Sequence, residues 1–252
     1  MLKNHTALIT GASSGIGYAT ALRLAQEGCN LNLVARRQER LTELKSLIEK
    51  KFSTQVKTVT GDITRDETIE KMTEQGFFES DILVNNAGAA IGRDEVKDLK
   101  TADLKSVIEL NVIAAFRMIQ SIVPSMLKEG RGDIVSLGSI AAVDPYPGGA
   151  TYCATKAALK TFHESLRQEV YGKNIRVMMV SPGMVETEFS LARFNQDQEK
   201  AQATYRGMTP LTSEDVAREI VHLLTNPRHA TVAELVLLAT DQGGATLVRR
   251  AP

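Results

Sequence analysis

The regular alternation of short apolar runs with longer amphipathic ones constrains the fold of this chain most strongly. Apolar residues at helical spacing predict helices, whereas short, continuously apolar runs predict strands that are buried on both faces of a sheet. We expect strands at residues 6–10, 31–35, 55–60, 81–88, 132–139, 174–183 and 231–239. We expect helices at residues 18–28, 37–51, 65–75, 101–130, 152–171 and 213–226. Helical crossovers of this length join parallel strands, so the pattern predicts an α/β fold.

The domain organisation follows from length and from the absence of any break in this pattern. The chain has 252 residues, enough for one large α/β domain, and it contains no internal repeat, low-complexity tract or linker. We therefore expect a single domain over residues 1–252. Pro124 is expected to disturb the long helix at 101–130. The irregular stretch 184–210 is too long for an ordinary connection, so we expect it to form a lid or loop beside a substrate.

Composition argues against several classes of partner. Lys and Arg number 30, as do Asp and Glu, so there is no basic excess that would drive nucleic-acid binding. No segment approaches the roughly 18 consecutive apolar residues of a membrane helix. Cys29 and Cys153 are too few for a disulfide framework, and we expect buried free thiols in a reducing compartment. With no secretory leader at the N-terminus, these features predict a cytoplasmic protein.

A glycine-rich turn, TGASSGIG (10–17), directly follows the first predicted strand and opens the first helix. Glycines let the chain turn sharply and let its backbone approach a ligand, and the free N–H groups at the start of a helix favour a phosphate. The spacing is G-x-x-x-G-x-G, and its strand–turn–helix setting makes it a dinucleotide signal. The residues of this turn that we expect to contact a cofactor are Gly11, Ser13, Ser14, Gly15, Ile16 and Gly17.

The end of the second predicted strand indicates which dinucleotide is bound. Many NAD sites place an acidic residue there to hold the ribose 2′-hydroxyl, whereas an arginine accommodates the 2′-phosphate of NADP. This chain has Arg36 and Arg37 there, with no acidic residue before Glu39. A guanidinium binds a phosphate through paired, charge-assisted hydrogen bonds, so we predict NADP as the cofactor. The alternative is that both arginines are solvated charges that open the next helix.

Two further strand ends carry polar residues, and ligands of parallel sheets bind at such ends. TGDIT (60–64) follows the third strand and is expected near the adenine, although an aspartate is also an ordinary residue before a helix. NNAG (85–88) ends the fourth strand, where a plain turn is the alternative to a cofactor contact. The residues expected to contact the cofactor here are Asp62, Ile63, Asn86, Ala87 and Gly88.

Four polar residues form a candidate catalytic group. Tyr152 and Lys156 are four residues apart on a predicted helix, so they share one face. The ammonium of Lys156 favours the phenolate and is predicted to lower the pKa of Tyr152 from its usual value of about 10. Ser139 ends the fifth strand and is predicted to hold the substrate oxygen beside the phenol. Asn111 lies among apolar neighbours, where its amide needs partners, and is predicted to order a water near the lysine. Taken singly, each is equally an ordinary structural residue.

The combined pattern resembles the short-chain dehydrogenase/reductase family, whose motifs are matched in order by TGASSGIG, NNAG, Asn111, Ser139, YCATK and SPGMVET. The resemblance covers residues 5–239 and implies a doubly wound Rossmann fold, with seven parallel strands and helices on both faces. It implies a catalytic tetrad of Asn111, Ser139, Tyr152 and Lys156, the last two also touching the cofactor. It further implies nicotinamide-side contacts from Pro182, Gly183, Val185 and Thr187. The family usually forms homotetramers or dimers through two long helices, here 101–130 and 150–172, so we expect a homo-oligomer and favour the tetramer.

Within the family, the chain most resembles the NADP-dependent 3-hydroxy acid dehydrogenases, which act on serine, 3-hydroxypropionate and similar short acids. This resemblance is carried by ARRQERL (35–41), PYPGGATYCATKA (145–157) and VETEFSLARF (185–194). Ser139 and Tyr152 are then expected to hold the reacting oxygen of a small-molecule substrate. Arg193 is the candidate for its carboxylate, because a guanidinium suits a carboxylate; the alternative is a surface arginine of the lid.

Two other functions stay open at this point. One is a broad-specificity NADPH-dependent carbonyl reductase, which the tetrad does not distinguish from an acid dehydrogenase. The other is a nucleotide-sensing protein on the same fold without turnover, because a fold does not fix a function. A metal is not expected in any of these, since the histidines form no cluster with cysteines or acidic residues at ligand spacing; these are His5, His222 and His229.

Overall fold

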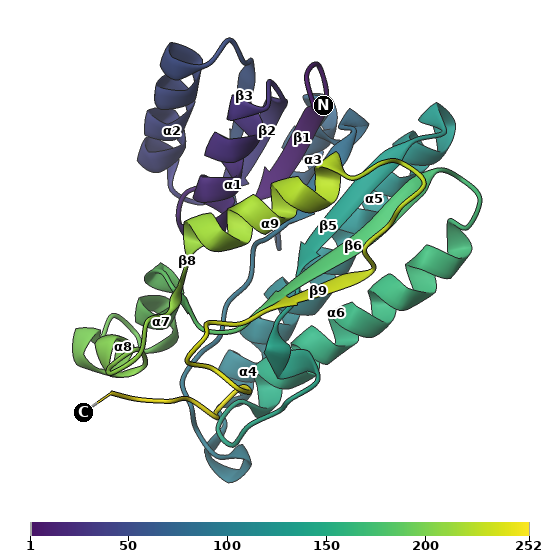
Figure 1. Ribbon diagram of the computed structural model, residues 1–252. Coiled ribbons are helices and arrows are strands. Elements are labelled where there is room, and N and C mark those ends of the chain that lie inside the picture. The colour runs from purple at the N-terminus through teal and green to yellow at the C-terminus, as the bar shows by residue number, and fades with distance from the viewer. Residues whose placement is uncertain (1, 252) are drawn as a thin grey trace.

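A seven-stranded parallel sheet lies at the centre of the computed structural model, which describes residues 2–251 (Figure 1). In spatial order the strands are β3 (Val56–Thr60), β2 (Asn30–Ala35), β1 (Thr6–Thr10), β4 (Ile82–Asn85), β5 (Gly132–Leu137), β6 (Ile175–Pro182) and β9 (Glu234–Leu237). Every neighbouring pair in this order is parallel. The predicted α/β Rossmann fold with a seven-stranded sheet is therefore confirmed.

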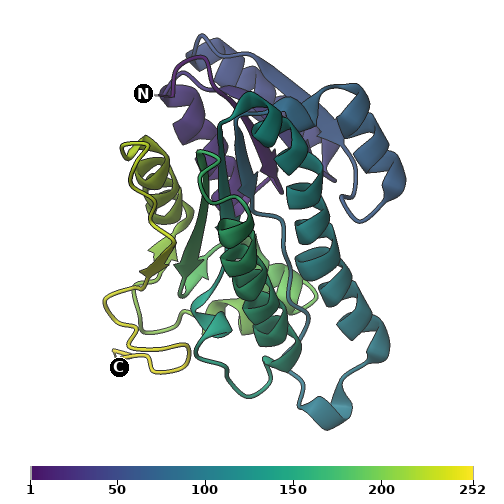
Figure 2. The ribbon, with the colours of Figure 1, turned by 90° about the vertical axis from the view of Figure 1, so that its right-hand side faces the viewer.

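Helices cover both faces of this sheet, as the view along its edge shows (Figure 2). One face carries α1 (Gly15–Gln26), α2 (Gln38–Lys51) and α9 (Ser213–Thr225). The other carries α3 (Asp66–Glu74), α5 (Ala115–Glu129) and α6 (Ala150–Glu169). The 3₁₀ helices are η1 (Phe77–Glu79), η2 (Val96–Asp98) and η4 (Ile140–Ala142).

Successive residues of a central strand point alternately into two layers of hydrophobic core, one on each face of the sheet. In β1, Ala7 and Ile9 belong to the cluster formed with α1, α2 and α9, whereas Leu8 belongs to the cluster formed with α5 and α6. All three side chains are completely buried. A strand buried on both faces has to be apolar at almost every position, which is why these strands appear in the sequence as continuous apolar runs.

A π-helical segment, η3 (Glu109–Ala114), separates α4 (Thr101–Ile108) from α5 in the long helix. The prediction that Pro124 disturbs this helix was wrong, because α5 continues through Pro124. A π-turn makes i→i+5 hydrogen bonds and is frequent at functional sites. Here it contains Asn111, the residue that had marked this helix as unusual.

The same long helix bears on the expectation that no segment of the chain is a membrane helix. The stretch Thr101–Glu129 is long and apolar enough to cross a membrane by length and composition alone. Apolar side chains of this helix, however, pack in the protein core: Met118, Ile119 and Ile122 are buried in the hydrophobic cluster that covers one face of the sheet. It is a core helix.

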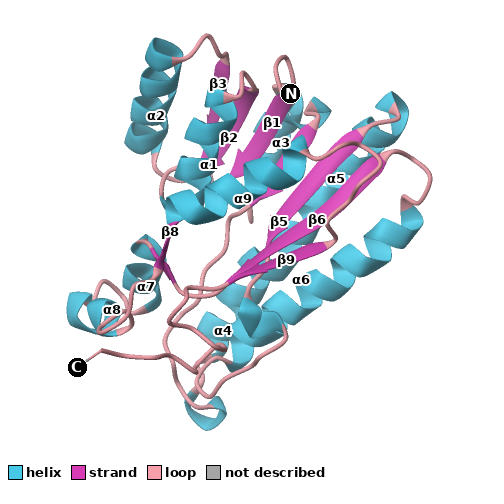
Figure 3. Cartoon of the chain, viewed as in Figure 1, coloured by secondary structure: helices cyan, strands magenta, loops and turns pink. Residues whose placement is uncertain are grey.

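Residues 184–210, which we call the lid, fold into short elements rather than an irregular loop. They contain β7 (Val185–Glu186), α7 (Glu188–Arg193) and α8 (Gln198–Ala203), and β7 pairs in parallel with β8 (Leu211–Thr212). In Figure 3 the lid lies beyond the carboxyl ends of the central strands, at the lower left. The lid therefore stands over the edge of the sheet where parallel sheets bind their ligands.

Candidate active site

A cavity of about 1240 Å³ runs along the carboxyl ends of the strands, between the glycine turn, α6 and the lid. It includes the point between β1 and β4 where the strand order reverses, the usual ligand site of such sheets. All the site residues predicted from the sequence line this cavity except Gly17 and Asn111. The lining residues run from the glycine turn to Tyr152, as an extended ligand with a second molecule beside it would require.

Gly17 lies behind the cavity wall and Gly11 lies in it, and both let backbone segments approach each other closely. A Cβ on Gly17 would lie 2.5 Å from the carbonyl oxygen of Gly11, so only glycine lets α1 pack this closely on the turn. Gly11 itself has a φ of 67°, in the left-handed region that favours glycine. The side chain of Ser14 does not cap α1, so the first N–H groups of this helix are available to a phosphate. The turn therefore fits the pyrophosphate of a dinucleotide.

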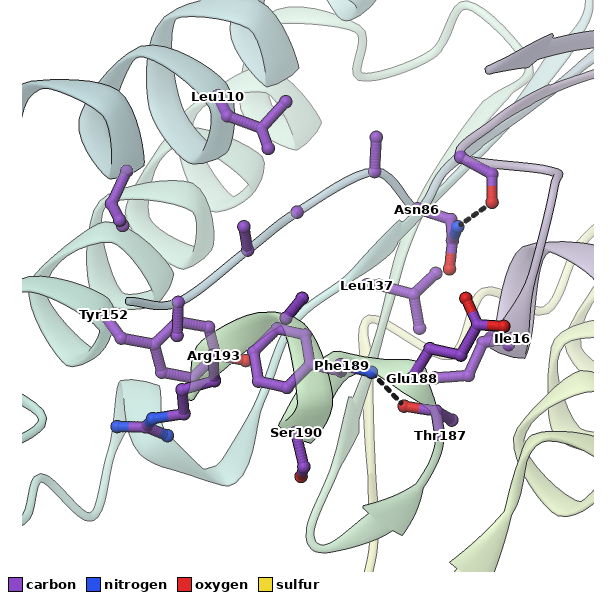
Figure 4. Close-up of a pocket in the computed structure, with 18 of the residues that line it drawn as sticks. Ile16, Asn86, Leu110, Leu137, Tyr152, Thr187, Glu188, Phe189, Ser190 and Arg193 are labelled. Carbon is purple, nitrogen blue, oxygen red and sulfur yellow. Dashed lines mark hydrogen bonds between the residues drawn. The ribbon is translucent and has the colours of Figure 1, made fainter. Parts of the chain in front are cut away.

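The NNAG turn is bound to the end of β1 by hydrogen bonds. Asn86 donates from Nδ2 to the Thr10 carbonyl oxygen at 2.8 Å, and the N–H groups of Asn86 and Ala87 both donate to Thr10 Oγ1 at 2.9 Å. Asn85 points into the protein instead, where its Nδ2 donates to the Ala115 carbonyl oxygen at 2.8 Å. Asn86 is thus a wall of the cavity (Figure 4), whereas Asn85 fixes the junction of η3 and α5.

Tyr152, Lys156 and Ser139 meet at the far end of the cavity. Lys156 Nζ lies 5.7 Å from the centroid of the Tyr152 ring and donates to the Leu137 carbonyl oxygen at 2.6 Å. Burial lowers the pKa of Lys156 to about 8, so the amine is still mostly protonated at neutral pH. Ser139 accepts a hydrogen bond at its Oγ from the Ala141 N–H at 3.1 Å. The Ser139 hydroxyl also lies beside the Tyr152 hydroxyl, so both groups can hold one substrate oxygen.

The pKa of Tyr152 departs from the sequence prediction. Burial raises it to about 12, and the lowering effects of the neighbouring Ser139 hydroxyl and Arg193 guanidinium are smaller. The predicted lowering of the Tyr152 pKa was therefore wrong, because desolvation of the phenolate outweighs the lowering effects of the nearby groups. At neutral pH Tyr152 is protonated, which suits it to donate a proton.

Asn111 lies behind this group and is only 2% exposed. Its Oδ1 accepts from the Ala89 N–H at 2.9 Å, and its Nδ2 donates to the Ala89 carbonyl oxygen at 2.8 Å and to Thr155 Oγ1 at 3.1 Å. Both amide hydrogens are used inside the protein, so a water can be bound only through the oxygen. A Cβ on Gly88 would lie 3.3 Å from Asn111 Oδ1 and 3.7 Å from Lys156 Nζ. Asn111 therefore positions the segment after NNAG against α6.

The other end of the cavity is rimmed by arginines. Arg37 donates from Nε and Nη2 to Ser13 Oγ, each at 3.3 Å, and from Nη1 to Glu188 of the lid at 2.7 Å. Arg40 donates to the other oxygen of Glu188 at 2.5 Å, and Arg36 is exposed at the same rim. Three guanidinium groups gathered here fit a 2′-phosphate. The sequence prediction omitted Arg40, although its place one helical turn after Arg37 puts both on one side of α2.

Two side chains of the lid reach toward Tyr152 (Figure 4). The ring of Phe189 lies 5.6 Å from the Tyr152 ring, measured between centroids. The guanidinium carbon of Arg193 lies 5.9 Å from the same ring, while its Nε donates to the Gly92 carbonyl oxygen at 2.9 Å and its Nη1 to the Tyr146 hydroxyl at 3.0 Å. Within residues 2–251, Nη2 of Arg193 makes no hydrogen bond and remains available to a ligand.

Tyr146 and Arg93 also line this end of the cavity, and the sequence prediction did not name them as ligand contacts. The guanidinium carbon of Arg93 lies 5.3 Å from the Tyr146 ring centroid. Both residues sit in connections without periodicity, so only the fold brings them together. Cys29 and Cys153 are buried free thiols, as predicted. No three His, Cys, Asp or Glu side chains of residues 2–251 gather as potential metal ligands.

Sequence similarity identifies the family. The family model described as short chain dehydrogenase matches residues 5–198. The chain belongs to the short-chain dehydrogenase family.

The similarity to individual short-chain dehydrogenases extends over the whole chain. An NADP-dependent 3-hydroxy acid dehydrogenase of Schizosaccharomyces pombe is 40% identical over 99% of this chain and 98% of its own length. Sulfoacetaldehyde reductase 2 of Chromohalobacter salexigens is 38% identical over 93% of this chain and 94% of its own length. A solved structure, the closed form of serine dehydrogenase complexed with NADP⁺, superimposes with a TM-score of 0.90 at 33% identity, covering 98% of this chain and 100% of that one. This short-chain dehydrogenase acts on CH–OH groups and uses NADP.

Proposed function

We propose that this short-chain dehydrogenase oxidises short 3-hydroxy acids, such as serine or 3-hydroxypropionate, with NADP⁺, and that it reduces the corresponding 3-oxo acids with NADPH. The observation that carries the proposal is the guanidinium of Arg193, which lies 5.9 Å from the Tyr152 ring with Nη2 unused. In a 3-hydroxy acid a single carbon separates the carboxylate from the hydroxyl-bearing carbon. We infer that a molecule held by its hydroxyl at Tyr152 can extend its carboxylate toward this guanidinium.

The surroundings of Arg193 strengthen its interaction with an anion. Its Nε and Nη1 are fixed by Gly92 and Tyr146, so little side-chain entropy is lost when a carboxylate binds. Phe189 lies over Tyr152 and limits the access of water, which makes a charge-assisted hydrogen bond stronger than in solvent.

Proton transfer in this mechanism belongs to the chain itself. When bound, NADP⁺ accepts a hydride from the hydroxyl-bearing carbon and NADPH returns it. Tyr152 is the group that donates a proton to the carbonyl oxygen during reduction and, as phenolate, accepts it during oxidation. Ser139 orients the reacting oxygen beside the phenol. Lys156 places its charge between Leu137 and Gly88, where it would bind cofactor hydroxyls. Asn111 holds the segment that follows Gly88 in place through its hydrogen bonds to Ala89.

The test follows the formation of NADPH by its absorbance at about 340 nm, with purified protein, NADP⁺ and one of four alcohols. The alcohols are L-serine, 3-hydroxypropionate, the sulfonate isethionate and the uncharged 2-propanol. We expect turnover with the carboxylates that exceeds turnover with 2-propanol by orders of magnitude. Turnover with 2-propanol alone would assign the protein to the general carbonyl reductases.

A sulfonate substrate is the second candidate. Arg93 and Arg193 both lie within 6 Å of the Tyr146 ring centroid, at 5.3 and 5.7 Å, so two guanidinium groups face the space where the anionic end of a substrate would lie. A sulfonate has three acceptor oxygens and uses two guanidinium groups better than a carboxylate does. A preference for isethionate over 3-hydroxypropionate in the same assay would select this candidate.

We further propose that the protein assembles as a homotetramer or a dimer through the outer faces of α5 and α6. Ile113, at the junction of α5, is 50% exposed, and Phe116 of α5 stacks on Phe162 of α6 with ring centroids 3.9 Å apart. A second copy would cover these apolar groups. Light scattering coupled to size-exclusion chromatography measures the mass of the assembly, and a monomer at micromolar concentration would refute this proposal.

A further inference from the structure

The carboxylate of Glu188 lies between two of the arginines that rim the NADP end of the cavity. Its Oε2 accepts from Arg37 at 2.7 Å and its Oε1 from Arg40 at 2.5 Å. Arg37 also donates to Ser13 of the glycine turn. An anion thus already engages the guanidinium groups that would bind a 2′-phosphate, and it comes from the lid, about 150 residues further along the chain.

The charge balance at this rim makes the carboxylate a competitor of the phosphate. Arg36, Arg37 and Arg40 supply three positive charges, and Glu188 removes one of them. A phosphate monoester carries roughly −1.5 to −2 charges at neutral pH, so it and Glu188 repel each other when they share the same arginines. The side chains are 40–47% exposed, so each ion pair is weak enough for a ligand to displace.

Glu188 is ionised under ordinary conditions. Partial burial opposes its ionisation, but the hydrogen bonds from Arg37 and Arg40 outweigh this and hold the pKa of Glu188 below its usual range. The competing charge is therefore present throughout the pH range in which the enzyme is assayed.

We propose that Glu188 is a specificity-determining residue that competes with the 2′-phosphate of NADP for Arg37 and Arg40, and thereby reduces the preference for NADP over NAD. NAD has no phosphate at this position, so its binding does not require the carboxylate to move. Replacement of Glu188 by a neutral residue frees two guanidinium groups for the phosphate alone.

The position of Glu188 also relates this rim to the catalytic end. Thr187 precedes it and caps α7, accepting at Oγ1 from the Phe189 N–H at 3.1 Å. Phe189 and Arg193, which reach Tyr152, belong to the same short helix. A movement of α7 that carries Glu188 away from Arg37 and Arg40 would therefore also move Phe189 and Arg193.

The test is a binding measurement on the variant Glu188→Gln, which keeps the size of the side chain and removes its charge. Isothermal titration calorimetry gives Kd for NADP⁺, NAD⁺, 2′,5′-ADP and 5′-AMP; the last two differ only in the 2′-phosphate and lack the nicotinamide. The matched control is Glu186→Gln, the same change two residues away at an exposed carboxylate without an ion pair to an arginine.

We expect Glu188→Gln to bind NADP⁺ and 2′,5′-ADP roughly three- to tenfold more tightly, the size expected for the loss of two exposed ion pairs that oppose binding. Kd for NAD⁺ and 5′-AMP should stay within about twofold, and Glu186→Gln should change none of the four by more than that. Unchanged or weaker binding of NADP⁺ by Glu188→Gln would overturn the proposal. A loss common to NADP⁺ and NAD⁺ would instead make Glu188 a clasp that holds the lid over either cofactor.

Discussion

Replacement of Arg193 by Ala should convert an enzyme that selects acids into one that does not. In the wild type, Arg193 can give a substrate carboxylate hydrogen bonds from Nη2 and from the second hydrogen of Nη1, since only Nε and one Nη1 hydrogen are used by Gly92 and Tyr146. A hydrogen bond to a charged group contributes about 1.5–3 kcal/mol. Two such bonds, partly exposed, amount to about 3–4 kcal/mol, which is a roughly 10²- to 10³-fold fall in kcat/KM.

The assay compares kcat/KM for 3-hydroxypropionate with kcat/KM for an uncharged alcohol of similar length, 1-propanol, in the same preparation of protein. The neutral alcohol reports any damage to the lid, because the loss of the contacts to Gly92 and Tyr146 affects both substrates alike. We expect the rate with 1-propanol to change by less than about tenfold. Arg193→Lys keeps the charge without the planar fork and should fall between wild type and Arg193→Ala.

Arg93→Ala is the matched control for a 3-hydroxy acid, since Arg93 is exposed and its guanidinium lies beside the same Tyr146 ring. It should lower kcat/KM for 3-hydroxypropionate by no more than about threefold. An equal fall with the acid and with 1-propanol in Arg193→Ala would refute the reasoning, because Arg193 would then be a structural residue of the lid.

Three further predictions concern the proton transfer and the scaffold. Tyr152→Phe should lower kcat by roughly 10³-fold or more because it removes the proton donor, and the Kd of NADPH, measured by fluorescence titration, should change far less than kcat. Retention of a tenth of the activity would exclude this role. Oxidation should become faster as the pH rises from about 7 to 8, since a Tyr152 pKa of about 12 leaves little phenolate, and the affinity for the cofactor should fall in both directions above about pH 8 as Lys156 loses its proton. An oxidation rate that is flat between pH 7 and 8 would contradict this prediction. Asp133→Asn should lower the free energy of unfolding in urea by about 3–5 kcal/mol, because Asp133 is 3% exposed and paired with Arg176 and Arg228, each at 2.6 Å. Asp133 lies at the opposite end of the sheet from the cavity, so the variant should leave the Kd of NADP⁺ unchanged.

The sheet and its helices could be predicted because each layer leaves its own pattern in the sequence. β1 is apolar at positions facing both layers, and α1 ends where Gly28, with a φ of 81°, turns the chain in the left-handed region. The glycine turn and NNAG could be assigned to a cofactor because a parallel sheet places the ends of β1 and β4 together. Their function follows from topology, which local sequence largely determines.

The sequence predictions failed where the structure depends on contacts between residues that are far apart in the sequence. Asn111 signalled something unusual in its helix, but the partners of its amide, Ala89 and Thr155, lie on other segments. The pKa of Tyr152 depends on burial beneath the lid, which a sequence does not reveal. Glu188 and Arg40 meet across about 150 residues, and neither carries a local signal of the other.

The charge of the substrate is the most direct test of the central proposal. Wild-type protein with saturating NADP⁺ is assayed with 3-hydroxypropionate and with its methyl ester, which has the same reacting carbon and no carboxylate. If Arg193 binds the carboxylate, kcat/KM should favour the acid by about 100-fold or more, as expected for a lost pair of charge-assisted hydrogen bonds. Equal or faster oxidation of the ester would show that the cavity does not recognise an acid, and would leave a general alcohol dehydrogenase with the same fold and the same catalytic group.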